Sequence, residues 1–207
     1  MKFWKLVTLA IAISASSNVS ANLISNNGFE DGLNGWNSTG NADIRTWDPV
    51  AYEGTNYLFG RNTQEFSVWQ DIDLFSHGYT ASQINSGAFS VVFGGMQSGW
   101  HTQADSGTIS IHLFNEEMSE LGFTSLGPFY SDHTWVNRMG ISDLLADTRY
   151  IQYRFYGTRV EYLNTDAYLD AAYLEVKGIS AVPVPAAIWL FGSGLIGLAS
   201  IFRRKVA

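Results

Sequence analysis

The sequence predicts an all-β fold, an antiparallel β-sandwich, between two terminal segments that serve targeting. Three observations lead to this prediction. Residues 22–182 contain no long amphipathic helix, short runs of alternating apolar and polar residues recur there, and turn-forming pairs such as Asn34-Gly35 and Ser86-Gly87 separate these runs. Alternation with a period of two directs one face of a strand toward a core. Many short strands joined by such turns favour two packed sheets.

The individual runs give the expected elements in chain order. Alternation predicts strands at residues 66–74, 109–114, 150–156 and 168–176, and a more uniformly apolar run predicts a buried strand at 88–93. Residues 81–85 and 142–145 are expected to form single helical turns, and residues 105–107 a reverse turn. Together these elements occupy one domain, residues 22–180.

The N-terminus has the layout of a secretory signal. Lys2 and Lys5 precede the apolar run 6–15, and small residues lead up to Ala21. We therefore expect a signal peptide over residues 1–21, cleavage between Ala21 and Asn22, and an exported protein. The alternative is a short membrane anchor, although the run is shorter than the roughly 20 residues that a membrane span needs.

The C-terminal segment, residues 181–207, has the layout of a membrane anchor. Residues 186–202 are uncharged and mostly apolar, and as a helix they would extend about 26 Å, close to the thickness of a hydrocarbon core. Arg203, Arg204 and Lys205 follow at once, and basic residues stay on the cytoplasmic side. A transmembrane helix over 186–202 is expected, with a buried core helix as the alternative.

A proline motif precedes this apolar segment and carries a family resemblance. Its residues are Val182, Pro183, Val184, Pro185 and Ala186. Motif, apolar span and basic end together resemble the PEP-CTERM class of sorting signals in the VPLPA-like variant, with Val184 where leucine is more usual. The resemblance implies processing near the motif by an exosortase, membrane anchoring before processing, a final place in the cell envelope or outside the cell, and an association with exopolysaccharide.

Composition excludes several function classes for the domain. Residues 22–180 hold all 19 acidic residues and seven of the 12 basic ones, so their net charge is −12 with neutral histidines. Such a surface repels nucleic acid. The chain has no cysteine, which excludes disulfides and thiolate metal sites. A structural calcium ion is one remaining way to hold loops together.

Two short segments of the domain carry a second resemblance. Asn27-Gly28-Phe29-Glu30 near its start and Tyr168-Leu169-Asp170 near its end resemble the galactose-binding-like jelly rolls of carbohydrate-binding modules. The resemblance implies a jelly-roll sandwich and a structural Ca²⁺ held by Glu30 and Asp170, with backbone oxygens near residues 53–56. The alternative is that both residues are ordinary surface carboxylates.

Aromatic residues suggest where a ligand binds. Trp100 lies in a polar stretch, residues 97–103, where a large apolar ring is less expected in a core. Sugar recognition combines aromatic faces with polar side chains, so Trp100 is the first candidate contact, and Trp69, Arg154 and Tyr156, together with Trp47, are expected to extend the face. The alternative is that all of these aromatics are packing residues.

Catalysis has little support in the sequence. His77, His101, His112 and His133 show no metal-ligand spacing such as H-E-x-x-H, and the domain contains no G-x-S-x-G motif. We therefore expect a non-catalytic, surface-anchored or processed protein that binds glycan or exopolysaccharide. Two alternatives stay open: a structural matrix or biofilm protein without a small ligand, and a secreted glycan hydrolase.

Overall fold

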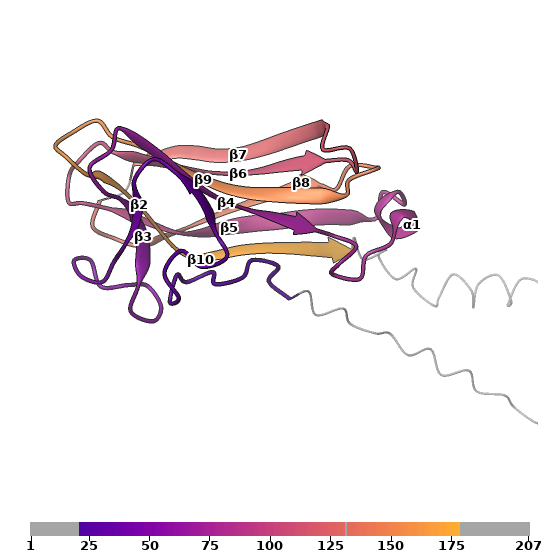
Figure 1. The fold of residues 1–207 in the computed structure, drawn as a ribbon, viewed down its shortest axis with the longest axis horizontal. Helices are drawn as coiled ribbons and strands as arrows, with labels where there is room; N and C mark the ends of the chain where they lie inside the picture. Colours follow the sequence, from indigo (N-terminus) through magenta and orange to yellow (C-terminus); the bar gives the residue numbers. More distant parts are fainter. Residues whose placement is uncertain (1–20, 131, 179–207) are drawn as a thin grey trace, which may run out of the picture. The chain divides into compact units, whose positions relative to one another are not determined.

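The computed structural model describes residues 21–130 and 132–178, and these form two five-stranded antiparallel sheets packed face to face (Figure 1). The first sheet has the order β1 (Asn37–Thr39), β4 (Glu65–Asp73), β9 (Tyr150–Thr158), β6 (Ser106–Phe114) and β7 (Glu120–Tyr130). The second has the order β2 (Ala42–Arg45), β3 (Tyr57–Gly60), β10 (Thr165–Gly178), β5 (Phe89–Gly99) and β8 (Val136–Asp143). The predicted all-β sandwich is confirmed.

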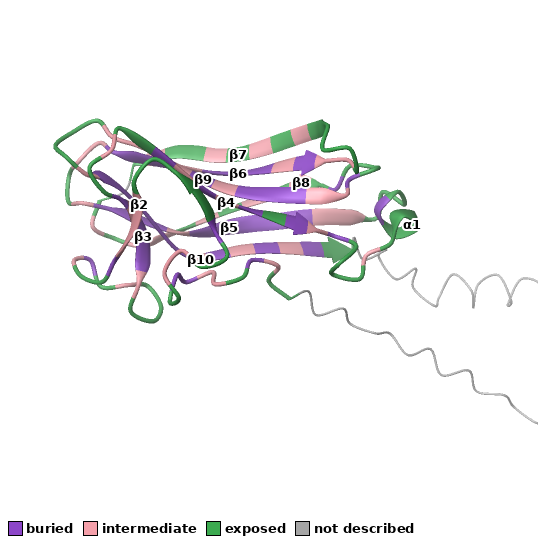
Figure 2. Cartoon of the chain, in the orientation of Figure 1, coloured by how far each residue is buried: buried purple, intermediate pink, exposed green. Residues whose placement is uncertain are grey.

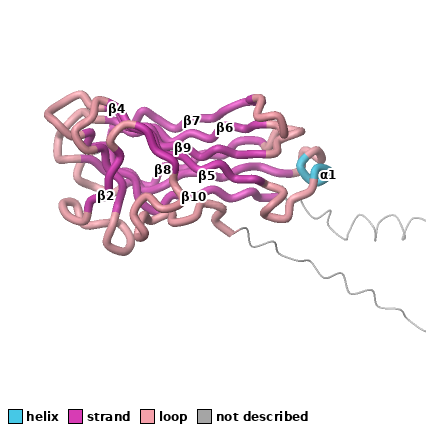
Figure 3. Tube along the Cα trace, in the orientation of Figure 1, coloured by secondary structure: helices cyan, strands magenta, loops and turns pink. Residues whose placement is uncertain are grey.

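Most predicted elements occur near their expected places, with two corrections. The run 66–74 is β4, 150–156 is β9, and 81–85 contains α1 (Ala81–Ile84), the one helix of the described ranges (Figure 3). The helical turn expected at 142–145 is wrong, because Ser142 and Asp143 pair with β5 and belong to β8, which ends at Asp143. The turn expected at 105–107 is also misplaced, since β6 begins at Ser106.

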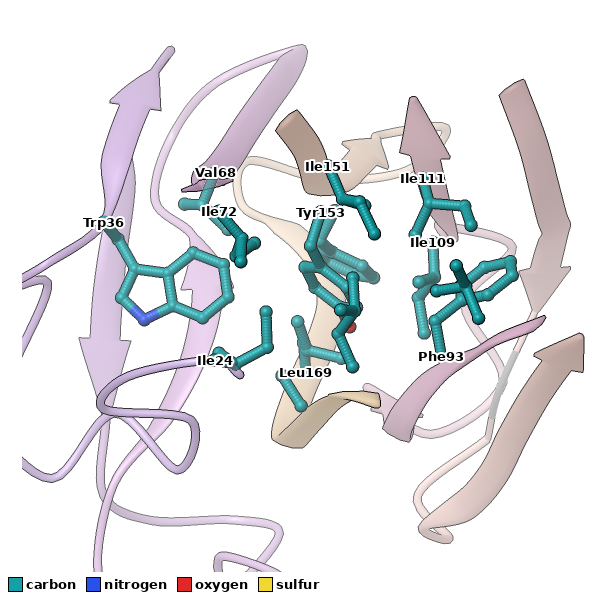
Figure 4. Packing of buried hydrophobic residues seen from close by; sticks show 14 of the residues in the cluster. Ile24, Trp36, Val68, Ile72, Phe93, Ile109, Ile111, Ile151, Tyr153 and Leu169 are labelled. Carbon is teal, nitrogen blue, oxygen red and sulfur yellow. The ribbon is translucent and has the colours of Figure 1, made fainter. Parts of the chain in front are cut away.

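The core lies between the two sheets and follows the predicted alternation. In β4, Phe66, Val68 and Ile72 are buried, whereas the residues between them are more exposed except for Gln70. Figure 4 shows side chains of both sheets meeting in this layer, with Tyr153 at its centre. Burying each large apolar side chain contributes roughly 1.5–3 kcal/mol. Figure 2 shows that β5 and β10 are mostly buried, while the edge strand β7 is largely exposed.

The first described residues are fastened along β10. The backbone N–H of Leu23 donates to the Leu174 carbonyl at 2.8 Å, and the Ala172 N–H donates to the Asn27 carbonyl at 2.9 Å. The Asn22 side chain adds two bonds, donating to the Ala172 carbonyl and accepting from the Leu174 N–H. The start of the predicted mature chain is therefore part of the folded domain.

The remaining terminal predictions lie outside the described residues. These are residues 1–20 of the signal peptide, the sorting motif and the helix expected over 186–202. Across residues 21–130 and 132–178, no helix is long and apolar enough to cross a membrane.

Candidate functional site

A pocket of about 660 Å³ lies among loops at one end of the sandwich. Three chain segments line it: the end of β2 with the following loop, the loop between β5 and β6, and the loop between β9 and β10 with the start of β10. Their lining residues are Arg45, Trp47, Trp100, His101, Thr102, Gln103, Glu161, Tyr162, Leu163, Asn164 and Asp166. Each segment leaves the end of a strand, so the rigid sheets fix where the pocket walls begin.

Arg45 forms the base of this pocket and joins two of its tryptophans. Its guanidinium carbon lies 4.1 Å from the ring centre of Trp47 and 4.6 Å from that of Trp100. The two indole rings meet edge to face, with centroids 5.9 Å apart. Arg45 itself is buried, which strengthens cation–π contacts of this kind because water does not compete for the charge.

A buried carboxylate balances the charge of Arg45. Asp166 lies 3.2 Å from the arginine Nη1, and the Tyr168 hydroxyl donates to Asp166 at 2.6 Å and accepts from Arg45 at 2.5 Å. Burial raises the pKa of Asp166, although Tyr168 and Arg45 oppose this shift. Burial and the neighbouring carboxylate also raise the pKa of Tyr168 far above its ordinary value, so the phenol stays neutral and donates. These contacts fix the floor of the pocket and balance the charge of Arg45.

A second buried carboxylate shapes the wall formed by residues 159–164. Asp105 Oδ1 accepts hydrogen bonds from the backbone N–H groups of Val160 (2.6 Å) and Glu161 (3.1 Å). Its Oδ2 accepts from the Asp166 N–H at 2.8 Å. Only 2% of Asp105 is exposed, so these bonds are shielded from water. One side chain thereby ties the wall to β6 and to the start of β10.

The rim of the pocket offers both apolar and polar groups. Trp47, Tyr162 and Leu163 are 60%, 78% and 68% exposed, which is unusual for side chains of this size. The side-chain oxygen of Gln103 is buried and has no hydrogen-bond partner, although it belongs to a residue that lines the pocket. An unpaired buried acceptor is costly, and a ligand hydroxyl that reached it after a movement of the side chain would relieve that cost.

The predicted binding residues fall on two surfaces. Trp100 lies in the pocket, whereas Trp69, Arg154 and Tyr156 lie together on the outer face of the first sheet. There Trp69 is directly opposite Arg154, whose guanidinium carbon lies 5.7 Å from the indole centre. Arg154 also donates to Gln152 at 2.7 Å. The structure therefore brings Trp69, Arg154 and Tyr156 together and separates Trp100 from them.

Glu30 and Asp170, the two residues expected to bind calcium, both hold the loop 52–56. Glu30 Oε1 accepts from the N–H groups of Thr55 and Asn56, each at 2.8 Å. Asp170 Oδ2 accepts from the N–H groups of Tyr52 (2.8 Å) and Glu53 (3.1 Å). Glu30 lies near the start of the domain sequence and Asp170 near its end, and both accept hydrogen bonds from the same loop.

The chemistry of these carboxylates suits a hard cation. Asp170 is fully buried, and burial raises its pKa to about 6, a shift that a neighbouring cation would reverse. Gly28 leaves room beside Asp170 and Glu53, since a Cβ there would lie 2.8 Å from Glu53 Oε1 and 3.5 Å from Asp170 Oδ1. Within the described part of the chain, however, no third acidic or histidine side chain joins Glu30 and Asp170 in a metal-sized cluster. Backbone carbonyls and water would have to supply the remaining ligands.

Comparison with known proteins gives information about the fold. No protein-family model and no curated protein sequence matches the chain. Among solved structures, TmCBM61 in complex with beta-1,4-galactotriose covers 75% of this chain and 98% of its own, with a TM-score of 0.51 and 17% identity. The module "Family 16 Carbohydrate Binding Module-2" covers 74% and 99%, with a TM-score of 0.54 and 12% identity. The domain has a fold like those of carbohydrate-binding modules.

A third similar structure is an enzyme. The enzymatically active domain of tailspike protein 4 from bacteriophage CBA120 matches 75% of this chain over 21% of its own length, with a TM-score of 0.56 and 11% identity. Sequence identities this low support a similarity of fold and nothing more. The sandwich by itself therefore does not separate binding from catalysis, and the function has to be argued from the side chains.

Proposed function

We propose that the domain binds glycan in the pocket formed by Arg45, Trp47 and Trp100, without catalysing a reaction on it. One observation carries this proposal: two tryptophans held by a buried arginine line an open pocket, and Gln103, which also lines it, has a side-chain oxygen without a hydrogen-bond partner. Aromatic faces pack against the C–H groups of a sugar ring, and fixed polar groups select its hydroxyls. The similarity to carbohydrate-binding modules supports the same conclusion.

The charge of the domain narrows the class of glycan. The net charge of residues 22–180 is −12, so the domain repels anionic polymers, including uronate-rich and sulfated chains. The charges at the base of the pocket, Arg45 and Asp166, are already paired with one another. We therefore propose a neutral polysaccharide as the ligand, with the cell's own exopolysaccharide as the first candidate.

A binding assay with three tryptophan variants tests the site. Trp100→Ala and Trp47→Ala should each weaken glycan binding by about 30-fold or more, the usual effect of truncating a central aromatic contact. Trp69→Ala, on the outer face of the first sheet, should leave affinity unchanged. Met139→Ala, at an exposed position of β8, is the matched control. Affinity electrophoresis on a panel of polysaccharides, followed by calorimetry, measures all four.

Each outcome has a distinct meaning. Loss of binding in Trp69→Ala alone would move the site to the sheet face with Arg154 and Tyr156. Absence of binding to every polysaccharide by a folded sample would overturn the proposal and favour a structural matrix role. Turnover of any polysaccharide, abolished by substitution in the pocket, would show a hydrolase instead.

We also propose that the protein is exported and held at the cell surface until its tail is processed. The signal layout of residues 1–21, the motif 182–186 and the apolar run 186–202 support this proposal. Intact-mass measurement on protein from its native cell tests both ends. Loss of the first 21 residues and cleavage near Pro185 are expected. An intact C-terminus in mature protein would favour simple anchoring without exosortase.

A structural Ca²⁺ at Glu30 and Asp170 completes the proposal. Its role is to hold the loop 52–56, which both carboxylates already contact. Calorimetric titration with Ca²⁺ on chelator-treated protein is the direct test, and one site per chain is expected. The absence of heat and of thermal stabilisation at millimolar Ca²⁺ would leave the two carboxylates as purely structural acceptors.

A further inference from the structure

Two histidines and an aspartate meet beside the pocket, although they are far apart in the sequence. Asp48 lies in the loop after β2, His101 in the loop after β5, and His133 in the loop after β7. One ligand atom of each lies within 4.8 Å of the other two, and no other such group of three or more histidine and acidic residues occurs in the described ranges. No sequence motif predicts this group, because its members share no short spacing.

The contacts inside this group differ from those of an ordinary hydrogen-bonded cluster. His133 Nε2 is buried and lies 2.5 Å from Asp48 Oδ1, yet it has no partner with hydrogen-bond geometry. The rings of His101 and His133 stack in parallel, with centroids 4.6 Å apart and planes at 9°. The buried nitrogen is therefore not committed to a hydrogen bond, and it faces a carboxylate oxygen and a second imidazole.

Hydrogen bonds between the loops hold the three residues in place. The Gly99 N–H donates to the Asp132 carbonyl at 3.0 Å, which fixes the end of β5 against the residue before His133. The Trp135 indole N–H donates to the Val50 carbonyl at 2.8 Å, which fixes the loop after β2 against the loop after β7. The group is therefore largely organised before any ion arrives.

From this geometry we propose that Asp48, His101 and His133 bind a divalent transition metal ion, with Zn²⁺ as the best-suited species. Two imidazoles and one carboxylate form a donor set suited to Zn²⁺, Cu²⁺ or Ni²⁺, whereas Ca²⁺ and Mg²⁺ prefer oxygen alone. Tetrahedral Zn²⁺ has ligand atoms about 3.3 Å apart. Asp48 Oδ1 and His133 Nε2 would therefore separate from their 2.5 Å contact, and the exposed His101 side chain would move to complete the set.

Three protein ligands leave a fourth position for water or a ligand oxygen. Because His101 also lines the pocket and its ring lies 4.6 Å from that of Trp100, this position is next to the proposed glycan site. The ion also ties together three of the loops at this end of the sandwich. Metal binding itself depends only on the three side chains and stands whether or not the pocket binds glycan.

Titration of chelator-treated, full-length protein with Zn²⁺ tests the proposal. One Zn²⁺ per chain is expected, together with tetrahedral d–d absorption when Co²⁺ is used, and quenching of tryptophan fluorescence by Cu²⁺ because Trp100 is adjacent. His101→Ala, His133→Ala and Asp48→Asn should each weaken Zn²⁺ binding at least about 100-fold, since loss of an outer-shell partner alone costs about 10–100-fold. Asparagine suits position 48, where φ is +38°.

Controls separate this site from adventitious binding. His77→Ala, at an exposed histidine between β4 and α1, should bind Zn²⁺ as the unsubstituted protein does. Circular dichroism establishes that each variant is folded, and His101 is exposed, so His101→Ala should fold normally. Failure to take up one equivalent of Zn²⁺ at micromolar concentration overturns the proposal. Uptake that survives all three substitutions, or that is lost in His77→Ala, overturns it equally.

Discussion

Asp105 is the side chain on which the pocket wall depends most, and its replacement gives the sharpest prediction. Asp105→Ala removes the acceptor of three backbone N–H groups, at 2.6, 3.1 and 2.8 Å. Hydrogen bonds to a charged group contribute roughly 1.5–3 kcal/mol each. Val160 and Glu161 are exposed, so their N–H groups can return to water, whereas the N–H of buried Asp166 loses its partner within the protein.

The size of the stability loss depends on how many of these N–H groups can bond to water instead. We expect Asp105→Ala to lower the free energy of unfolding by about 3–5 kcal/mol, out of a total of about 5–15 kcal/mol for a domain. The melting temperature should fall by about 10 °C, at about 2–4 °C per kcal/mol. Asp105→Asn keeps one acceptor oxygen, which can accept either from the N–H groups of Val160 and Glu161 or from that of Asp166. The free energy of unfolding should therefore fall by about half as much.

Urea unfolding and amide hydrogen exchange measure the two parts of this effect. Exchange should accelerate at Val160 and Glu161 in both variants, and glycan affinity should fall with it because the wall is no longer fixed. Asp143→Ala, at an exposed aspartate at the end of β8, is the charge-matched control and should change stability by less than about 0.5 kcal/mol. An Asp105→Ala protein within about 1 kcal/mol of the unsubstituted one, with normal exchange at 160 and 161, would refute the reasoning.

Three further predictions concern the rest of the domain. Gly157→Ala should destabilise it by about 1–3 kcal/mol in urea unfolding, because the added Cβ would lie 2.2 Å from the Phe66 ring; a neutral result would show that this ring can move aside. The Arg149 side chain, which donates to Asp73 at 2.8 Å, holds the pKa of that carboxyl below its ordinary value. The stability from this pair is therefore present above the ordinary pKa of an aspartate and is lost as the pH falls through the lowered one; Arg149→Met should reduce this acid-side loss, and an unchanged pH profile would contradict the assignment. Ca²⁺ should raise the melting temperature of the unsubstituted protein and not that of Asp170→Asn, and equal stabilisation of both would place the ion elsewhere.

The fold could be predicted where local pattern and tertiary pairing agree. Strand β4 alternates along its whole length, so its burial could be anticipated from the sequence. The three-residue β1 and the four-residue β2 are too short to show a period. At 142–145 the local preference for a turn is overridden by pairing of β8 with β5, which the sequence does not reveal.

The site could be predicted only in part, for a related reason. Trp100 was recognisable because a large ring in a polar stretch is unusual. The residues around Trp100 come together only in the folded protein: Arg45 and Asp166 are 121 residues apart in the sequence. The histidines of the proposed metal site likewise come from different loops. Trp69 and Arg154 lie together on the sheet face, and their separation from Trp100 depends on which end of each strand a loop leaves.

The direction of β10 has a mechanical consequence. This strand begins beside the pocket, at Thr165 and Asp166, and runs to Gly178 at the other end of the sandwich, near α1 (Figure 1). It lies between β3 and β5 in the middle of its sheet. If the pocket holds a polymer as proposed, tension between that polymer and the chain beyond Gly178 would act along this strand and load its backbone hydrogen bonds in shear. Hydrogen bonds loaded in shear break together and not one at a time, so β10 would carry such a load along its whole length.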